Sequence, residues 1–324
     1  MRNAPRGTAH KAPPDENGAV AKPVGRITRG TTGTNRLRRF DRWIAALPAL
    51  RRSDDPLVVD LGYGASATTV IELHDRLARV RPDVEVVGVE IDPERVAAAE
   101  RTLRELPDRG PSAPPENRGP SAPPENRGSS APPENRGSSA PQARIETPPR
   151  RVSFRLGGFE APTPDRRVPA IIRAANVLRQ YDEAEVPAAW DRMLARLQPG
   201  GALVEGTCSE NGRVGSWVTL SPERGVETLT LGLHLPSLEA PSIVAERLPK
   251  ALIHRNVPGE PIHAFLSDLD RAWASAAPLS VYGPTQRWIA TADAVRERWP
   301  VVGGRTRWRL GELTVAWDAV RPQP

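Results

Sequence analysis

Short apolar runs alternate with segments of helical periodicity along much of the chain. Residues 57–61 are apolar almost throughout, and in residues 67–80 apolar side chains recur every three or four positions. A second apolar run at 84–90 precedes Pro93, a residue that favours the first turn of a helix. The pattern predicts strand, helix, strand and helix in succession. The right-handed crossover of such a unit implies a parallel sheet.

The same alternation continues after residue 150. Further strands are predicted at 152–156, 169–178, 202–205, 216–220, 227–235 and 308–317, and helices at 183–197, 242–253, 261–276 and 285–297. Before the first strand, Thr34 or Asn35 is expected to cap a helix that runs to about Leu47. The fold class is therefore α/β, a doubly wound and mostly parallel sheet. Residues 236–324 are expected to add a mainly helical elaboration that closes the sheet and shapes an acceptor site.

Two segments lack a hydrophobic period. Residues 1–33 are rich in proline, glycine, threonine and charge, and are predicted to be a disordered basic tail. Residues 109–142 repeat the nine-residue unit RGPSAPPEN with small variations, and this unit offers no apolar position to bury. We therefore expect 107–150 to be a disordered insertion in a surface loop, with docking of a proline-binding module as the alternative. The core is assigned to 34–106 and 151–235.

The positive charge of the chain is concentrated at its beginning. The net charge is +6, whereas residues 1–42 alone hold ten basic and three acidic side chains, so the remainder is almost neutral. Such a tail can bind phosphate backbones, but it also serves as an ordinary solubilising arm. Nucleic-acid binding through residues 1–42 is left open and is not favoured.

Other residue types limit the setting of the protein. Cys208 is the single cysteine, so no intramolecular disulfide can form, and a reducing cytoplasm is the expected location. No apolar stretch approaches the roughly 20 residues that span a bilayer, and no signal-peptide core is found. The histidines lack the spacing of metal ligands, so no metal site is predicted.

The strongest chemical pattern is LVVDLGYGASATTV at 57–70 followed by VVGVEIDPE at 86–94. Gly62 and Gly64 follow a buried strand, where glycine lets the backbone approach a ligand, and Glu90 ends the next strand, where a carboxylate can accept both ribose hydroxyls. Asp60 stands where dinucleotide-binding folds usually have an apolar residue. A carboxylate suits a cationic sulfonium cofactor better than a pyrophosphate.

With these motifs and the turn LQPGG before the strand at 202–205, the chain resembles the class I S-adenosylmethionine-dependent methyltransferases over about 57–106 and 151–207. The resemblance implies S-adenosylmethionine as cofactor. The residues that it assigns to the cofactor are Asp60, Gly62 and Gly64 for the methionine part, Glu90 for the ribose, Gly158 and Phe159 for adenine, and Asn176 beneath the transferring methyl.

The chain departs from the family pattern at two turns. Ser66 replaces the third glycine of the usual motif, and Gly157-Gly158 stands where the family often has Gly-Asp. Glu160 follows two residues late. The loop after the strand at 169–178 lacks the (D/N)-P-P-(Y/F) tetrad of methyltransferases that act on nucleobase amino groups.

No catalytic residue is fixed by the sequence. The candidates near the end of the fourth strand are Asn176, Arg179 and Tyr181, whereas Asp182 and Glu183 are expected to begin the next helix as cap and first-turn acid. Methyl transfer mainly needs donor and acceptor to be held in line, and only an acceptor that must lose a proton requires a base.

The sequence therefore predicts a methyltransferase of unknown acceptor, with a small molecule slightly favoured. The alternative is a non-catalytic methyltransferase-like domain that binds RNA or a protein partner through its basic N-terminus. Two further classes rank lower. An RNA 5-methylcytosine methyltransferase would use Cys208 as nucleophile, but this chain lacks the Pro-Cys pair that such enzymes would have at 175–177. A nicotinamide-dependent oxidoreductase is disfavoured by Asp60. The oligomeric state is not determined by these patterns.

Overall fold

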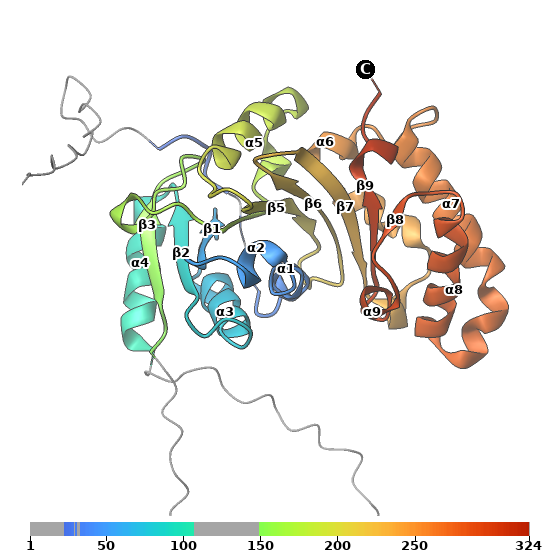
Figure 1. Ribbon diagram of the computed structural model, residues 1–324, viewed down its shortest axis with the longest axis horizontal. Coiled ribbons are helices and arrows are strands. Elements are labelled where there is room, and N and C mark those ends of the chain that lie inside the picture. The colour runs from blue at the N-terminus through green and yellow to red at the C-terminus, as the bar shows by residue number, and fades with distance from the viewer. Residues whose placement is uncertain (1–22, 29, 31–32, 107–148, 324) are drawn as a thin grey trace, which may run out of the picture.

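A single mixed sheet forms the centre of the molecule. The structure is a computed structural model that describes residues 23–28, 30, 33–106 and 149–323. Within these residues the strand order is β3-β2-β1-β4-β5-β6-β7-β9-β8, from one edge of the sheet to the other (Figure 1). The strands are β1 (Leu57–Leu61), β2 (Glu85–Glu90), β3 (Val152–Leu156), β4 (Ile171–Ala175), β5 (Ala202–Cys208), β6 (Val214–Ser221), β7 (Gly225–Leu233), β8 (Val301–Val302) and β9 (Glu312–Ala316).

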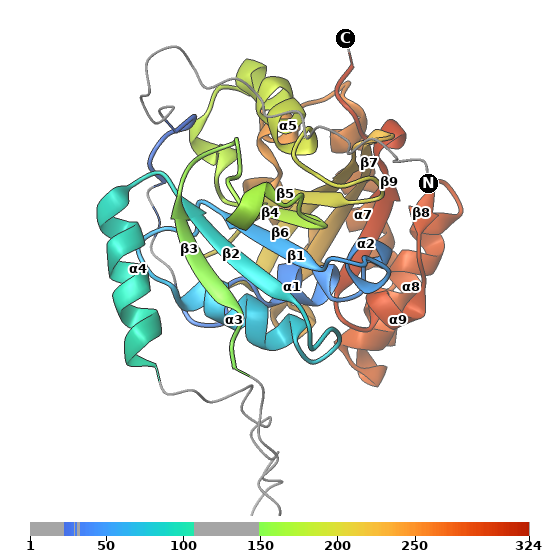
Figure 2. The same ribbon diagram turned by 60° about the vertical axis from the view of Figure 1, so that its left-hand side comes forward.

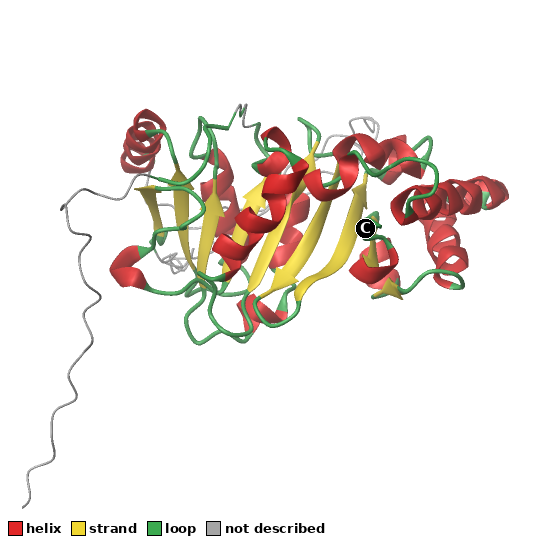
Figure 3. Cartoon of the chain, turned by 90° about the horizontal axis from the view of Figure 1, so that it is seen from above, coloured by secondary structure: helices red, strands yellow, loops and turns green. Residues whose placement is uncertain are grey.

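Helices cover both faces of the sheet, as the view along it shows (Figure 3). They are α1 (Arg38–Ile44), α2 (Pro48–Arg51), α3 (Thr68–Leu77), α4 (Pro93–Glu105), α5 (Val186–Leu194), α6 (Lys250–Ile253), α7 (Pro261–Ser275), α8 (Pro284–Arg296) and α9 (Arg305–Trp308). Short 3-10 helices include η2 (Leu178–Gln180), η3 (Glu183–Glu185) and η5 (Pro241–Arg247). None of the helices within the described residues has the length and apolar character needed to cross a membrane.

The two faces follow from alternation along the strands. On β1, Val59 and Leu61 belong to the hydrophobic layer shared with α5, α7 and α8, and Val58 belongs to the layer shared with α1, α3 and α4. Figure 2 shows α3 and α4 on one side of the sheet and α5 on the other. The predicted doubly wound α/β fold is therefore confirmed. Its parallel part is β3-β2-β1-β4-β5, and β6, β7, β9 and β8 extend it with antiparallel pairings.

The strand order places a crevice at the end of β1. This strand pairs in parallel with β2 on one side and with β4 on the other, so the chain crosses to opposite sides of β1 in successive units. Leu61 lies beside both Val89 and Ala174. The loops after all three strands consequently leave the sheet at the same edge, which is where open α/β sheets bind ligands.

The expected bounds of three segments need correction. The first helix begins at Arg38 and not at Thr34 or Asn35, because Asn35 has the left-handed φ of 61° and its cap position, Leu37, makes no side-chain cap hydrogen bond. Residues 242–253 form a 3-10 helix and a separate single turn, since Pro249 between them has no N–H to continue a helix. The final strand is shorter than 308–317, because Gly311 turns the chain with a φ of 76°.

The prediction of a disordered tail over 1–33 is wrong for residues 24–28, which form hydrogen bonds with residues that follow the central strands. Residues 1–22 lie outside the described residues. Most of the predicted insertion at 107–150 likewise lies outside the described residues. Its last residue, Arg150, is described and forms an ion pair with Asp75 of α3, with 2.9 Å between Nε and Oδ1.

Candidate functional site

Two adjoining cavities open at the carboxyl ends of β1, β2, β4 and β5. The larger is a cleft of about 800 Å³, and the smaller has a volume of about 20 Å³. The structure brings all nine residues predicted for the site to one or both of them. The cleft is lined by Asp60, Gly62, Gly64, Asn176 and Arg179, and the small cavity by Gly62, Glu90, Gly158, Phe159 and Tyr181.

The turn after β1 is built for close approach of a ligand. Gly62 and Gly64 have φ values of 65° and 86°, in the left-handed region that L side chains rarely adopt. A Cβ atom at Gly62 would come within 2.9 Å of Val177 Cγ2, so the space above this residue is available only to glycine. Glu90 fixes the turn, because its Oε2 accepts the N–H of Gly64 at 2.9 Å and its Oε1 accepts the N–H of Ile91 at 2.9 Å.

A segment near the N-terminus crosses this site, and we define the strap as Val24–Thr28. The carbonyl of Val24 accepts the N–H of Phe159 at 2.8 Å, and the N–H of Arg26 donates to the hydroxyl of Tyr181 at 2.5 Å. The strap therefore lies along the residues that the sequence assigned to adenine. Burial raises the pKa of Tyr181, with the hydrogen bond from the strap opposing the shift.

The strap also covers Glu90. The carbonyl of Thr28 accepts a hydrogen bond of 2.9 Å from Nη1 of Arg95, and the same nitrogen lies 3.7 Å from Glu90 Oε2. Only 1% of the Glu90 surface is exposed. Between strap and strand ends, about 20 Å³ of free volume remains, which is roughly the room that one water needs.

The residues on this edge fit a nucleoside cofactor, whereas the space beside them is filled by the chain itself. The glycine turn and the Glu90 carboxylate supply the close backbone approach and the acceptor that a ribose requires. A side chain at Gly158 would reach within 2.0 Å of the carbonyl oxygen of Val24, so this glycine keeps room that the strap now takes. A nucleoside can therefore reach these groups only after the strap has moved.

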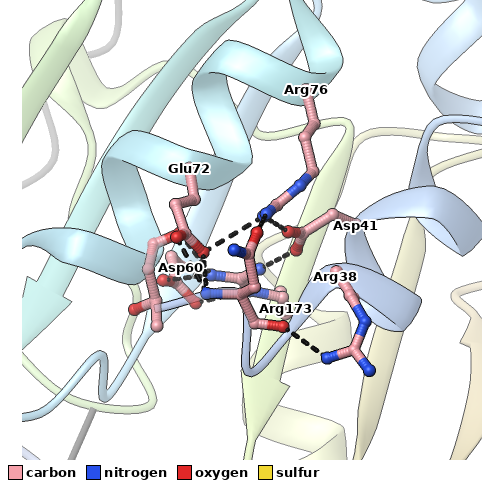
Figure 4. Close-up of polar contacts among 8 residues, drawn as sticks. Arg38, Asp41, Asp60, Glu72, Arg76 and Arg173 are labelled. Carbon is pink, nitrogen blue, oxygen red and sulfur yellow. Dashed lines mark hydrogen bonds and ion pairs between the residues drawn. The ribbon is translucent and has the colours of Figure 1, made fainter. Parts of the chain in front are cut away.

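Asp60 is held in a buried network of charges (Figure 4). The guanidinium of Arg173, from β4, donates to both carboxylate oxygens of Asp60 at 2.8 and 2.5 Å. On its other side Arg173 pairs with Asp41 of α1, which also pairs with Arg76 of α3. Burial lowers the pKa of Arg173, but Asp60 and Asp41 more than offset that effect and raise it. Glu72 completes the chain with an ion pair to Arg76 at 3.2 Å.

This network changes the role expected of Asp60. A carboxylate paired through both oxygens with a fully buried guanidinium presents little net charge to the cleft. Arg173 and Asp41 were not identified from the sequence, because neither belongs to a motif and their contacts with Asp60 are long-range. Asp60 lines the cleft wall and fixes β1, β4 and α1 relative to one another.

Asn176 joins the ends of β4 and β5. It has a left-handed φ of 62°, a conformation that asparagine tolerates better than most other residues. Its side-chain oxygen accepts the N–H of Cys208 at 2.9 Å, and its amide nitrogen lies 3.6 Å from the cysteine Sγ. Cys208 is buried beside the cleft. Asn176 therefore sets the floor of the cleft at the strand ends where an acceptor is expected.

The remaining predicted positions have local structural roles as well. Glu160 accepts the N–H of Gly158 at 2.8 Å, and so binds the turn where the family often has an aspartate. Ser66, in place of the third glycine, lies 2.7 Å from the hydroxyl of Thr68. Asp182 begins η3, where its N–H donates to Glu185 at 2.8 Å, as expected for a helix start.

Several residues of the site were not found by sequence reasoning. Arg247 of η5 and Arg36 line the cleft, together with Arg26 and Thr28 of the strap. Arg26 and Arg36 were counted only as charges of the basic N-terminus. Arg247 lies far from any motif, and only the packing of η5 against β5 and β6 brings it to the cleft. Among the described residues, no group of three metal-ligating side chains is found.

Neither a protein-family model nor a curated protein sequence matches this chain. Among solved structures, it is similar to human N-acetylserotonin methyltransferase in complex with SAM, with 18% identity, a TM-score of 0.29, and coverage of 55% of this chain and 36% of that one. It is also similar to the CcbJ methyltransferase from Streptomyces caelestis, with 15% identity, a TM-score of 0.32 and coverage of 61% and 70%. A third is the glycopeptide N-methyltransferase MtfA complexed with sinefungin, with 17% identity, a TM-score of 0.30 and coverage of 56% and 53%. At these TM-scores the likenesses assign neither ligand nor activity, so both are argued below from the chain's own residues.

Proposed function

We propose that this chain is an S-adenosylmethionine-dependent methyltransferase. One observation carries the proposal: the glycine turn after β1, Glu90 at the end of β2 and Asn176 after β4 converge on one edge of the parallel part of the sheet, around a cleft of about 800 Å³ and the small cavity that adjoins it. That volume is in the range of small-molecule sites. The cofactor supplies a methyl group on a cationic sulfonium, and the protein's task is to position it.

The chain's residues divide this task between the two cavities. Glu90 would accept the ribose hydroxyls, and Gly62 lets the backbone approach them. Gly158 and Phe159 would border the base once the strap has moved. Asn176 forms the floor where the acceptor would lie. No side chain in this cleft is assigned as a base, so an acceptor that is already a free nucleophile suits the site best.

Titration calorimetry of the full chain with S-adenosylmethionine, S-adenosylhomocysteine and NAD tests the proposal. We expect micromolar affinity for the first two and none for NAD. Glu90→Gln should weaken binding about tenfold, since charge-assisted hydrogen bonds to the ribose would be lost. Glu94→Gln removes the same charge from an exposed position on α4 and serves as the matched control. Binding of NAD alone would refute the assignment.

A second candidate function is favoured by the strap. If Val24–Thr28 never leaves the nucleoside side of the site, the domain is a non-catalytic relative that uses its surface for a partner. The same titration separates the two candidates, because a permanently filled site binds neither S-adenosylmethionine nor S-adenosylhomocysteine at any concentration up to the millimolar range.

A further inference from the structure

The cleft beside the glycine turn is rich in arginine. Among the described residues, four arginines line it: Arg26, Arg36, Arg179 and Arg247. The two acids on its wall do little to balance them. Asp60 is already paired with Arg173, and Glu210 is exposed to solvent at the rim. The cleft therefore carries an excess of positive charge over a volume suited to a small molecule.

Two of these arginines have no carboxylate partner within the described part of the chain. Arg26 forms an ion pair with Glu185 at 2.9 Å, whereas Arg179 donates only to the backbone carbonyl of Glu246 at 3.0 Å. The guanidinium of Arg247 has no ion pair there. Burial lowers the pKa of Arg179 and the neighbouring charge of Arg247 lowers it further, whereas the carboxylate of Glu246 opposes the shift. The two guanidiniums repel each other, and an anion bound between them would relieve that repulsion.

The backbone of Arg247 is held in place by the sheet. Its backbone carbonyl accepts two hydrogen bonds of 2.6 Å, one from the hydroxyl of Thr207 on β5 and one from that of Ser216 on β6. Both hydroxyl-bearing residues are at least 99% buried. These bonds attach the end of η5 to the sheet. Arg179 lies in η2, three residues after Asn176. Both arginines line the cleft, and their charges are close enough to interact.

We infer that the methyl acceptor is a small molecule with an anionic group, a carboxylate or a phosphate, which Arg179 and Arg247 bind together. Guanidinium groups bind both anions through paired, charge-assisted hydrogen bonds. The anion would anchor the acceptor beside Asn176, at the carboxyl end of β4. That the bound molecule is a methyl acceptor rests on the proposed function, and that it carries an anionic group rests on the arginine pair.

The test is a titration of the full chain with inorganic phosphate and, separately, with succinate, at constant ionic strength. We expect millimolar binding of at least one of them, unchanged when S-adenosylhomocysteine is saturating. Arg179→Gln and Arg247→Gln should each weaken it about tenfold. Arg309→Gln, which removes an exposed arginine that does not line the cleft, should leave it unchanged. Binding of phosphate alone, or of succinate alone, identifies which anionic group the acceptor carries.

Four results would overturn the inference. The first is that neither anion binds, and the second is that both arginine variants bind the anions as the wild type does. The third is competition between the anions and S-adenosylhomocysteine, which would mean that the arginine pair holds the cofactor's own carboxylate. The fourth is binding of single-stranded RNA through the same pair with a steep salt dependence, which would mean that the ligand is a nucleic acid. Failure of the proposed function is a different result, because it shows as absent cofactor binding in wild-type protein whatever the anions do.

Discussion

Glu205 is expected to make the stability of this protein fall as the pH rises through neutrality. It lies in the middle of β5 and is completely buried, on the same face of the sheet as Leu203 and Trp190. Neither of its carboxylate oxygens has a hydrogen-bond partner in the described structure. Burial raises the pKa of this carboxyl from 4.5 to about 8, and nearby Trp190 opposes the shift.

The direction of the effect follows from the two pKa values. Below pH 4.5 the carboxyl is protonated in both folded and unfolded chains, so its contribution to stability is fully present. Between 4.5 and about 8 the folded chain keeps a proton that the unfolded chain has released, and stability falls by about 1.4 kcal/mol per pH unit. Across the whole window the loss is on the order of 5 kcal/mol.

Glu205→Gln removes this titration while keeping the shape of the side chain. Urea unfolding of both proteins at pH 5.5, 6.5 and 7.5 measures the difference in unfolding free energy, in which the titration of all other groups cancels. Relative to the wild type, the variant should gain about 3 kcal/mol between the first pH and the last. Glu94→Gln, on the surface of α4, should show no such trend. A wild-type-to-variant difference that stays constant over this range would refute the reasoning.

Four further predictions follow from the site and the sequence. Tyr181→Phe removes the hydroxyl that accepts the Arg26 N–H of the strap. Because the strap then has one hydrogen bond fewer to break before the cofactor binds, S-adenosylmethionine should bind about 3- to 10-fold more tightly in calorimetry. Weaker binding would show that the hydroxyl contacts the cofactor instead. Arg173→Met leaves the buried carboxylate of Asp60 unpaired and removes one of the two partners of Asp41, and should cost about 3–5 kcal/mol in urea unfolding, with a loss below 1 kcal/mol contradicting it. Deletion of residues 109–142 should leave the melting temperature within about 5 °C, which is on the order of 2 kcal/mol for a domain of this size, and a larger fall would show that the repeat packs. Cys208→Ser should retain cofactor binding and most methyl transfer; loss of transfer alone, together with a covalent adduct on 5-fluorocytosine-containing RNA, would favour the RNA 5-methylcytosine alternative.

The order of strands and helices could be predicted because local patterns encode it. Apolar runs gave β1 and β2, and Pro93 marked the start of α4 within one residue. The glycine turn and Glu90 were located because they lie at strand ends, where topology alone brings them together. These features depend on short stretches of sequence and need no knowledge of distant contacts.

The parts that could not be predicted depend on pairs of residues far apart in the chain. Arg173 neutralises Asp60 although the two residues are 113 positions apart in the sequence, and no local pattern around either residue indicates that they pair. The strap was assigned to a disordered tail because Val24–Thr28 has no hydrophobic period; its order comes from backbone hydrogen bonds to Phe159 and Tyr181. Arg247 lies at the cleft in a segment whose backbone carbonyl is held by two buried hydroxyls from strands 31 and 40 residues away.

The strap has a consequence for the time course of ligand binding. The nucleoside side of the site is open only in the fraction of molecules in which Val24–Thr28 has left the strand ends, so capture of the cofactor must wait for that departure. In a stopped-flow experiment the observed rate should then level off as cofactor concentration increases, at a ceiling equal to the rate at which the strap detaches. A segment that contributes only a few hydrogen bonds to the fold would thereby set the maximum rate of cofactor binding.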